Sequence, residues 1–234
     1  MKLDNDTIKF INRVVTTAQL VNIDDIIIET DCIRAIDEHK SVIILQKQDI
    51  PELPFSAIGL NRVATFQGRY DIAKTQDKFA IDAVLDDNDE FVRSLVMKGK
   101  GVKIDYRCAN PTTINAPSAL KDIAHHQVHL NADAVLLFQK GLGAMGSEHV
   151  TIISNEDGVS FEFADNNADV FSHQFADSAK ALSEDADDMF AFKYSAKTLS
   201  ALFKHDPVGT FAIGKSGTLS MNINDLNITV LPRV

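Results

Sequence analysis

The stretch KLDNDTIKFINR, residues 2–13, recurs in a weaker form 127 residues later as HLNADAVLLFQK, residues 129–140. In this alignment Asp6 stands over Asp133, and apolar positions of one copy meet apolar positions of the other. In the first copy Asn5 or Asp6 is suited to be the N-cap, and apolar residues at helical spacing follow it. We therefore expect a short amphipathic helix near the start of each half of the chain, and halves that are related by duplication.

A second pair of similar stretches supports the duplication. FSAIGLNRV, residues 55–63, aligns with YSAKTLSAL, residues 194–202, at an offset of 139, and the two matches come in the same order in both halves. The second residue of each stretch is a serine, which is suited to cap a helix. The pair predicts two more helices, over 55–66 and 194–205.

Most of the remaining sequence has β-branched residues in short runs bounded by turn residues, which predicts strands. Gly158 and Gly217 stand where hairpin turns are expected. Each half then runs strand, helix, strands, helix, strands. The fold class is α+β, with two duplicated β-rich domains that each carry two short helices. The predicted β-rich segments are 24–37, 41–48, 78–85, 90–99, 101–108, 149–164 and 209–234.

The stretch CANPTTINAPSALKD, residues 108–122, lies between the two halves and contains two prolines and little charge. This composition is typical of an extended connector. A length of 234 residues suits one or two domains. We predict domains over residues 1–108 and 122–234, joined by a connector over residues 109–121.

The composition limits the class of protein. The chain has 33 acidic and 23 basic side chains and a net charge of −10, which excludes a protein that is basic all over but not a local basic patch. Cys32 and Cys108 are far apart and form no CxxC motif. The N-terminus lacks a signal-peptide core, and no apolar run has the length of a membrane helix. We expect a cytoplasmic protein with reduced cysteines and no membrane segment.

No segment predicts catalysis. HHQVH, residues 125–129, is a histidine cluster, but no nearby Cys or Glu completes a tetrahedral metal site. GLGAMG, residues 141–146, follows a predicted helix, so it indicates a helix end and not a phosphate loop. The acidic runs 86–90 and 184–188 lack the order of a calcium loop. We therefore expect no enzyme activity, no catalytic residue, no metal and no cofactor.

The charge on the four predicted helices is unusual for so acidic a chain. Lys197 and Lys204 are seven residues apart, so they share one helix face. The acids on these helices, Asp6 and Asp133, lie near helix starts. The alternative is that these four helix faces are simply exposed to solvent, but solvent-exposed helix faces usually carry both acidic and basic residues. The pattern favours an anionic partner, contacted by Lys9, Arg13, Arg62, Lys140, Lys197 and Lys204.

Two similar β-rich halves, each with two short basic helices and joined by an extended connector, resemble the DNA sliding clamps of the two-domain, ring-forming type. This family includes proliferating cell nuclear antigen (PCNA) and the processivity clamps of T-even-like bacteriophages. The likeness lies in MKLDNDTIKFI (1–11), AIDEHKSVIIL (35–45) and GTLSMNINDLNITVLPRV (217–234), and the overall pattern covers nearly the whole chain.

The resemblance implies a DNA-clamp fold in which three identical chains close into a ring around double-stranded DNA. The six basic residues would then face the DNA and contact phosphates without reading bases. Such a clamp is a processivity factor that tethers a replicative DNA polymerase and is placed on DNA by a clamp loader. RNA polymerase or late-transcription factors are further partners of some phage clamps. A viral clamp would act in the host cytoplasm.

The resemblance also implies two protein-binding surfaces. The ring would close by pairing of edge strands, here VKIDYRC (102–108) of one subunit with DVFSHQF (169–175) of the next. Partner peptides would insert apolar anchors into a pocket near the connector, although ordinary packing is the alternative for each of its residues. By position this pocket consists of Ile36, Val42, Ile44, Ile114, Pro117, Leu231 and Pro232.

Three other functions are compatible with the sequence. A viral processivity factor could hold DNA by charge alone, without a ring. A β-rich phage structural or assembly protein could have a duplicated domain and no DNA contact. A hydrolase is the weakest alternative, because no nucleophile stands with a base in the sequence.

Overall fold

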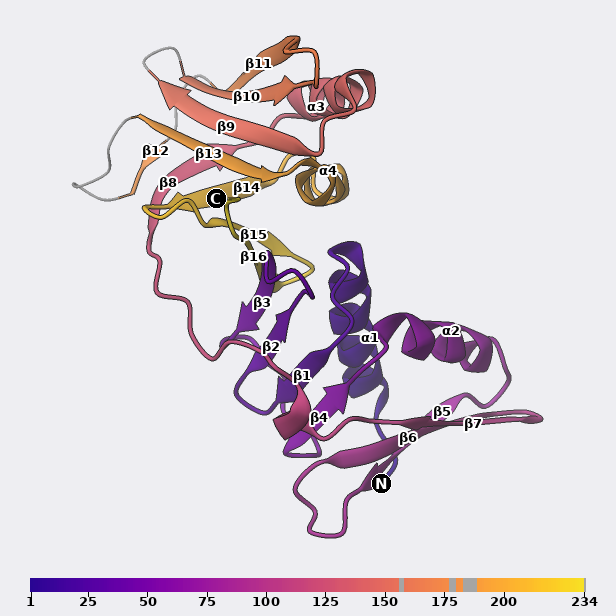
Figure 1. The fold of residues 1–234 in the computed structure, drawn as a ribbon. Helices are drawn as coiled ribbons and strands as arrows, with labels where there is room; N and C mark the ends of the chain where they lie inside the picture. Colours follow the sequence, from indigo (N-terminus) through magenta and orange to yellow (C-terminus); the bar gives the residue numbers. More distant parts are fainter. Residues whose placement is uncertain (156–157, 177–179, 183–188, 234) are drawn as a thin grey trace. The chain divides into compact units, whose positions relative to one another are not determined.

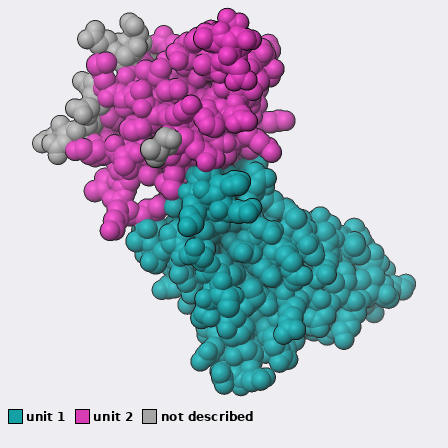
Figure 2. Space-filling model, in the orientation of Figure 1, with its two compact units in different colours: residues 1–119, 224–226 teal, residues 120–223, 227–234 magenta. Residues whose placement is uncertain are grey.

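The computed structural model describes residues 1–155, 158–176, 180–182 and 189–233. The chain divides into two compact units, drawn in different colours in Figure 2. Unit 1 comprises residues 1–119 together with 224–226, and unit 2 comprises residues 120–223 together with 227–234. No helix in the described part of the chain has the length and apolar character needed to cross a membrane.

Unit 1 combines two α-helices with a mixed sheet (Figure 1). The strand order is β3-β2-β1-β4-β6-β5, and β7 also pairs with β6. The strands pair antiparallel except β4 and β6, which meet in parallel at Ile58 and Val92. In chain order the elements are α1 (Asn5–Leu20), β1 (Ile26–Glu29), β2 (Ile33–Ile36), β3 (Val42–Gln46), β4 (Ala57–Leu60), α2 (Val63–Lys74), β5 (Ala80–Leu85), β6 (Val92–Gly99), β7 (Val102–Arg107) and a short 3₁₀ turn (Pro111–Thr113).

Unit 2 contains two sheets and two α-helices. One sheet has the order β11-β10-β9-β13, and the other contains the run β12-β8-β14-β15-β16. The elements are β8 (Ala124–His129), α3 (Ala132–Met145), β9 (His149–Asn155), β10 (Gly158–Ala164), β11 (Val170–Ala176), β12 (Lys180–Ala181), β13 (Phe190–Ser195), α4 (Ala196–His205), β14 (Thr210–Gly214), β15 (Leu219–Ile223) and β16 (Leu226–Val230).

Helix α1 forms where the sequence predicts it, because a cap and an apolar stripe coincide there. The side chain of Asp4 accepts a hydrogen bond of 2.7 Å from the backbone N–H of Thr7, which satisfies one of the free donors at the helix start. The cap lies one or two residues before the predicted position. The predicted apolar stripe, which includes Ile8, Ile11 and Val14, is buried.

The core of unit 2 is built around the ring of Phe138 on α3. Phe161 and Phe163 of β10 each lie 5.0 Å from it between ring centroids, and Phe203 of α4 lies 5.2 Å away. All three pairs are edge-on, the arrangement that aromatic quadrupoles favour. One buried side chain therefore joins both helices of the unit to one sheet.

The first half of the predicted repeat is confirmed. Helices α1 and α3 begin at Asn5 and Ala132, 127 residues apart. Their caps are Asp4 and Asn131, the latter accepting 2.8 Å from the N–H of Ala134, and these too are 127 residues apart. The alignment of residues 2–13 with 129–140 therefore matches equivalent positions of two helices.

The helix predicted over residues 55–66 is wrong in its first half. Residues 57–60 form β4, which is buried between β1 and β6, and the helix α2 starts only at Val63. The run AIGL is apolar throughout, so a helix there would have no polar face. Burial in the sheet therefore decides its conformation. Gly59 packs so closely that an added Cβ would lie 2.6 Å from the backbone oxygen of Ala109.

This correction also changes the second half of the repeat. Helices α2 and α4 begin at Val63 and Ala196, 133 residues apart, so the offset of 139 had aligned a strand with a helix. Helix α4 itself is confirmed with its cap, because Ser195 Oγ accepts from the N–H of Thr198 at 3.4 Å. Ser56, by contrast, precedes a strand and caps no helix.

The glycines predicted to end a helix or make turns have left-handed or related backbone conformations. Helix α3 ends at Gly146, whose φ of 61° favours glycine and whose N–H bonds to Leu142 O. Gly217, with φ of 82°, lies in the turn that joins the antiparallel strands β14 and β15. Gly158, with φ of 122°, starts β10 and stands opposite Asn155 of the antiparallel strand β9. The sequence GLGAMG is thus a helix end.

Candidate nucleic-acid interface

Helix α1 presents Lys9 and Arg13, and both are charge-compensated. Lys9 Nζ lies 3.4 Å from the carboxylate of Asp6, with both side chains highly exposed. Arg13 Nη1 lies 2.6 Å from Asp225, and its guanidinium is 5.5 Å from the ring centroid of Phe10. Both basic residues line a hollow of about 440 Å³ together with the loop residues 49–51. Arg13 is therefore held by an acid and an aromatic ring, whereas Lys9 has only a longer, solvent-exposed ion pair.

The sequence predicts Arg62 on a helix face, but the structure places it elsewhere. It is the N-cap residue of α2, with φ of 56° and ψ of 54°, and its side chain makes no capping hydrogen bond. Its guanidinium lies 5.8 Å from the ring centroid of Tyr106 on β7. Arg62 Nη2 also donates to the backbone oxygen of Arg107 at 3.4 Å. The residue thus belongs to the junction of α2 with β7.

Arg69 is a basic residue that the sequence analysis missed. It lies in the second turn of α2, is half-buried, and its guanidinium is 5.7 Å from the same Tyr106 ring. The helix predicted over residues 55–66 ends before Arg69, so this arginine was not among the predicted basic residues of the helices. A helix placed three residues after Leu60 would have included it.

The solvent face of α2 carries an acid in the body of the helix. The expectation that acids lie only near the helix starts is therefore wrong for α2. Asp71 lies in its third turn and pairs with Lys74 at 2.5 Å. The hydrogen bond from Lys74 lowers the pKa of the Asp71 carboxyl below its usual value. Ile72 on the same helix is 57% exposed. The outer surface of α2 therefore carries mixed charge and an apolar side chain.

Helices α3 and α4 of unit 2 carry Lys140, Lys197 and Lys204, all exposed. Within the described residues none of the three lies within ion-pair distance of a carboxylate. The two helices are joined by a reciprocal pair of bonds, from Gln139 Nε2 to Ser200 O at 3.0 Å and from Ser200 Oγ to Gln139 Oε1 at 2.7 Å. Three free ammonium groups thus stand on a fixed pair of helices.

The two predicted ring-closing segments are edge strands. β7 pairs only with β6 along its length, and β11 pairs only with β10, among the strands that the structure describes. Lys103, Asp105 and Arg107 alternate as exposed residues along β7. Each strand therefore has one edge that pairs with no other strand among those that the structure describes.

The residues proposed for a partner pocket are divided between the units. In unit 1, Val42, Ile44 and Ile114 are buried, while Ile36 and Pro117 are half-buried. In unit 2, Leu231 and Pro232 are half-buried. The buried members already pack within their own unit, so only the half-buried ones offer surface for a peptide.

The histidine and acidic clusters have ordinary local contacts in the part of the chain that the structure describes. Along β8 the side chains alternate, so His126 is buried while His129 is exposed and lies 2.9 Å from Thr210 Oγ1. Among the described residues, no three His, Cys, Asp or Glu side chains are grouped to hold a metal ion. Asp86 accepts from the N–H of Glu90 and so shapes the turn after β5. The acidic run 184–188 lies outside the described residues.

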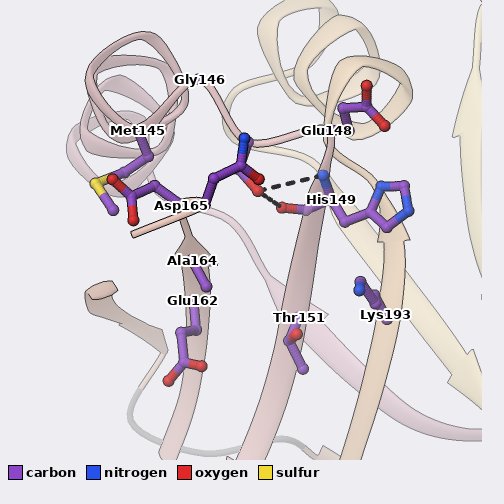
Figure 3. A pocket seen from close by; sticks show the side chains of 11 residues that line it. Met145, Gly146, Glu148, His149, Thr151, Glu162, Ala164, Asp165 and Lys193 are labelled. Atoms are coloured by element: carbon purple, nitrogen blue, oxygen red, sulfur yellow. Dashed lines mark hydrogen bonds between the residues drawn. The ribbon is translucent and has the colours of Figure 1, made fainter. Parts of the chain in front are cut away.

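A polar hollow of about 360 Å³ lies in unit 2 at the C-terminal end of α3 (Figure 3). In the register of the sheet, Thr151 stands between Glu162 and Lys193 on the neighbouring strands. Three carboxylates in the lining, those of Glu148, Glu162 and Asp165, outnumber the one lysine. This charge balance disfavours a phosphate, so the hollow is not part of the candidate interface.

No family model matches the sequence, and no curated protein does. Solved structures match the fold. The PCNA of A. fulgidus, solved with the C-terminal region of FEN-1 bound, is 14% identical with a TM-score of 0.62, covering 97% of this chain and 96% of that chain. PCNA from Thermococcus kodakaraensis is 14% identical with a TM-score of 0.62, covering 100% and 99% of the two chains. PCNA from Entamoeba histolytica is 12% identical with the same TM-score, covering 96% and 95%. The expected α+β clamp fold is confirmed.

Proposed function

We propose that this chain is a DNA sliding clamp, a processivity factor that encircles double-stranded DNA and tethers a replicative DNA polymerase. The observation that carries the proposal is the extent of the likeness to PCNA, which covers at least 96% of this chain in three solved structures. Both units and their order are included in that match. A DNA binder that works by charge alone has no need of two such units, and nothing favours a structural or assembly protein.

The ring would be a homotrimer closed by pairing of β7 in one subunit with β11 in the next. The support is the unpaired edge of each strand, because an exposed edge invites addition of a strand from another chain. The contact joins different surfaces of the two subunits, so it repeats head to tail and closes only if the rotation per subunit completes a circle.

The DNA contacts would come from the basic residues of the helices without sequence specificity. Lys140, Lys197 and Lys204 are free to meet phosphates, and Lys9, Arg13 and Arg62 are the corresponding candidates of unit 1. A clamp is held by topology, so weak phosphate contacts suffice and base contacts would hinder sliding. The acidic remainder of the chain would limit adhesion of DNA elsewhere.

Protein partners would dock by short peptides, as the C-terminal region of FEN-1 is bound in the A. fulgidus PCNA structure. Within unit 1 the half-buried Ile36 and Pro117, and within unit 2 the half-buried Leu231 and Pro232, are the candidates for contact with such peptides. The partners would be a DNA polymerase and a clamp loader, with RNA polymerase or late-transcription factors as further candidates. The clamp would have no catalytic activity, and a viral clamp would act in the host cytoplasm.

The mass of the particle in solution tests the proposal. Sedimentation of the purified chain should give three times the chain mass at micromolar concentration. Replacing Arg13, Lys197 and Lys204 together by Glu should leave that mass unchanged and weaken DNA binding, because phosphates would then meet carboxylates. A matched control is Lys215→Glu, which changes an exposed lysine at the end of β14. A monomer, or a triple variant that binds DNA like the wild type, would contradict the proposal.

A further inference from the structure

The ring of Tyr106 is a fixed platform inside unit 1. It is fully buried, and its hydroxyl donates to the backbone oxygen of Asn61. Phe66 of α2 meets it edge-on, with 5.2 Å between centroids and 82° between planes. The ring is therefore held by a hydrogen bond at one end and an aromatic neighbour at its edge, so groups that rest on it are positioned too.

Two arginines converge on this one ring. The guanidinium carbons of Arg62 and Arg69 lie 5.8 and 5.7 Å from its centroid, both within the range of a cation–π contact. Within the described residues neither guanidinium lies within ion-pair distance of a carboxylate. The carboxyl of Asp25 lies near the backbone N–H of Arg62 instead, and burial raises its pKa. Two guanidinium groups near one ring, without an ion-pair partner among the described residues, favour an anion beside them.

Arg62 stands in a conformation that suits other residues better. A φ of 56° is uncommon for a residue with a side chain and costs least for Gly or Asn. An N-cap position also favours a short side chain with an oxygen acceptor, which arginine lacks. A local conformational cost that persists at one residue is typical of a functional position.

We propose that Arg62 and Arg69 together bind neighbouring phosphates of duplex DNA, and that Tyr106 is the positioning residue for both. The cation–π contact holds each guanidinium at the ring, and Arg62 also donates from Nη2 to the backbone oxygen of Arg107. The remaining N–H groups of the two guanidiniums match phosphate geometry. An arginine already ordered by its platform loses less freedom on binding. The inference rests on the proposed clamp function and deepens it, by naming Arg69 and Tyr106 and by making Arg62 part of a pair.

Equilibrium binding of a short fluorescent duplex over a series of salt concentrations tests the arginine pair. Each phosphate contact contributes about 0.9 to the slope of log affinity against log salt. Arg69→Ala should lower the slope by about one contact and Arg62→Ala by a similar amount. Lys100→Ala, which removes an exposed charge from the turn between β6 and β7, should leave the slope unchanged. A slope for Arg69→Ala equal to that for Lys100→Ala would overturn the inference.

The role of Tyr106 is tested by variants that change no charge. Tyr106→Leu should lower the salt slope, whereas Tyr106→Phe, which keeps the ring, should preserve it. In a chain that already carries Arg62→Ala and Arg69→Ala, Tyr106→Leu should have no further effect on the slope, which a general packing defect would not produce. A slope that stays at the wild-type value in folded Tyr106→Leu would remove the positioning role.

Arg62→Gly removes one arginine and leaves the buried Tyr106 in place. This variant should fold, because glycine adopts a left-handed backbone conformation at little cost. It should retain the wild-type melting temperature and still lose one contact from the slope. A wild-type slope for this variant would count against the pair.

Sedimentation separates the remaining outcomes. If Arg69→Ala reduces the particle mass, the arginines hold a second copy of the chain and not DNA, and the inference fails while the clamp function stands. If the wild type shows no salt-dependent binding at all, the proposed function fails first.

Discussion

The two helix pairs carry positive charge in different ways. In unit 1, Arg13 is paired with Asp225, and Arg62 and Arg69 rest on one aromatic ring. In unit 2, the lysines of α3 and α4 stand exposed with no carboxylate within ion-pair distance among the described residues. Arginine offers fixed, planar contacts and lysine a mobile point charge. Even Arg13 and Lys140, which hold equivalent positions in the aligned helices α1 and α3, differ in residue type and in their ion-pair partners.

The helices are also attached to their units differently. In unit 2 the ring of Phe138 joins α3 to α4 and to β10, and the Gln139–Ser200 bonds reinforce the pair. In unit 1 the attachment of α2 runs through Tyr106 and the edge strand β7. Damage to Phe138 should consequently affect the fold of unit 2, whereas damage to Tyr106 should affect the placement of charge.

The largest expected effect is on the core of unit 2. Phe138→Ala should lower the free energy of unfolding by about 3–5 kcal/mol, because it removes a fully buried ring that touches three others. Denaturant unfolding measures it. Leu136→Ala on the same helix, at a position 52% exposed, is the control and should change stability by less than about 0.5 kcal/mol. Equal effects of the two variants would show that α3 does not depend on this cluster.

A pair of glycine variants tests the attachment of β4 and α2 in unit 1. Gly59→Ala should destabilise by about 1–3 kcal/mol, because its Cβ would lie 2.6 Å from a backbone oxygen of Ala109 that cannot easily move. Gly68→Ala in α2 meets nothing within 4 Å and should stabilise by about 0.5–1 kcal/mol through helix propensity. Thermal unfolding compares them. A neutral Gly59→Ala would contradict the close approach of β4 to residue 109.

The sequence predicted an element correctly where the conformation that its own residues favour is also the one that packing in the fold requires. Helices α1, α3 and α4 were predicted correctly because each has a polar cap and one apolar face. Helix α2 was misplaced because β4 just before it is apolar on both faces, as a strand inside a sheet is. Only pairing with β1 and β6, which are distant in sequence, decides that segment.

The candidate interface was less predictable than the fold. The exposed lysines of unit 2 were found because helix periodicity alone places them. The partners of the arginines were not, since Asp225 is 212 residues from Arg13 and Tyr106 lies on another element. Contacts of this kind carry no local signal in a single sequence.

The anchor of the connector in unit 2 should give a measurable dependence on pH. Burial opposes ionisation of Asp122, but hydrogen bonds from Ser216 and Thr218 outweigh it and lower its pKa below the usual 3.8. A depressed pKa contributes stability above pH 3.8 that is lost as the pH falls through the folded value. Asp122→Ala should cost about 1–3 kcal/mol at neutral pH and less in acid. A cost that does not shrink in acid, measured by denaturant unfolding, would contradict this account.

The smallest expected effect comes from removing the ion-pair partner of Arg13, which would leave this arginine without a carboxylate partner among the described residues, like the lysines of α3 and α4. Asp225→Ala releases Arg13 from its partner, and loss of this partly exposed ion pair should cost about 0.2–1 kcal/mol. If the freed guanidinium then reaches DNA, the salt slope of binding should rise by about 0.9. Asp87→Ala breaks the exposed pair with Arg93 and serves as the control, with no change in slope expected. A rise of equal size in both variants would indicate only a change in net charge.

Retention on DNA with blocked ends tests the clamp most directly. The protein would be threaded onto a linear duplex attached at one end, the free end would be closed with a bulky block, and the sample would be washed with high salt. A ring should stay on the blocked duplex through the wash and leave once the DNA is cut, because topology and not charge retains it. Loss during the wash, whether or not the end is blocked, would contradict the clamp and identify a protein that holds DNA by charge alone.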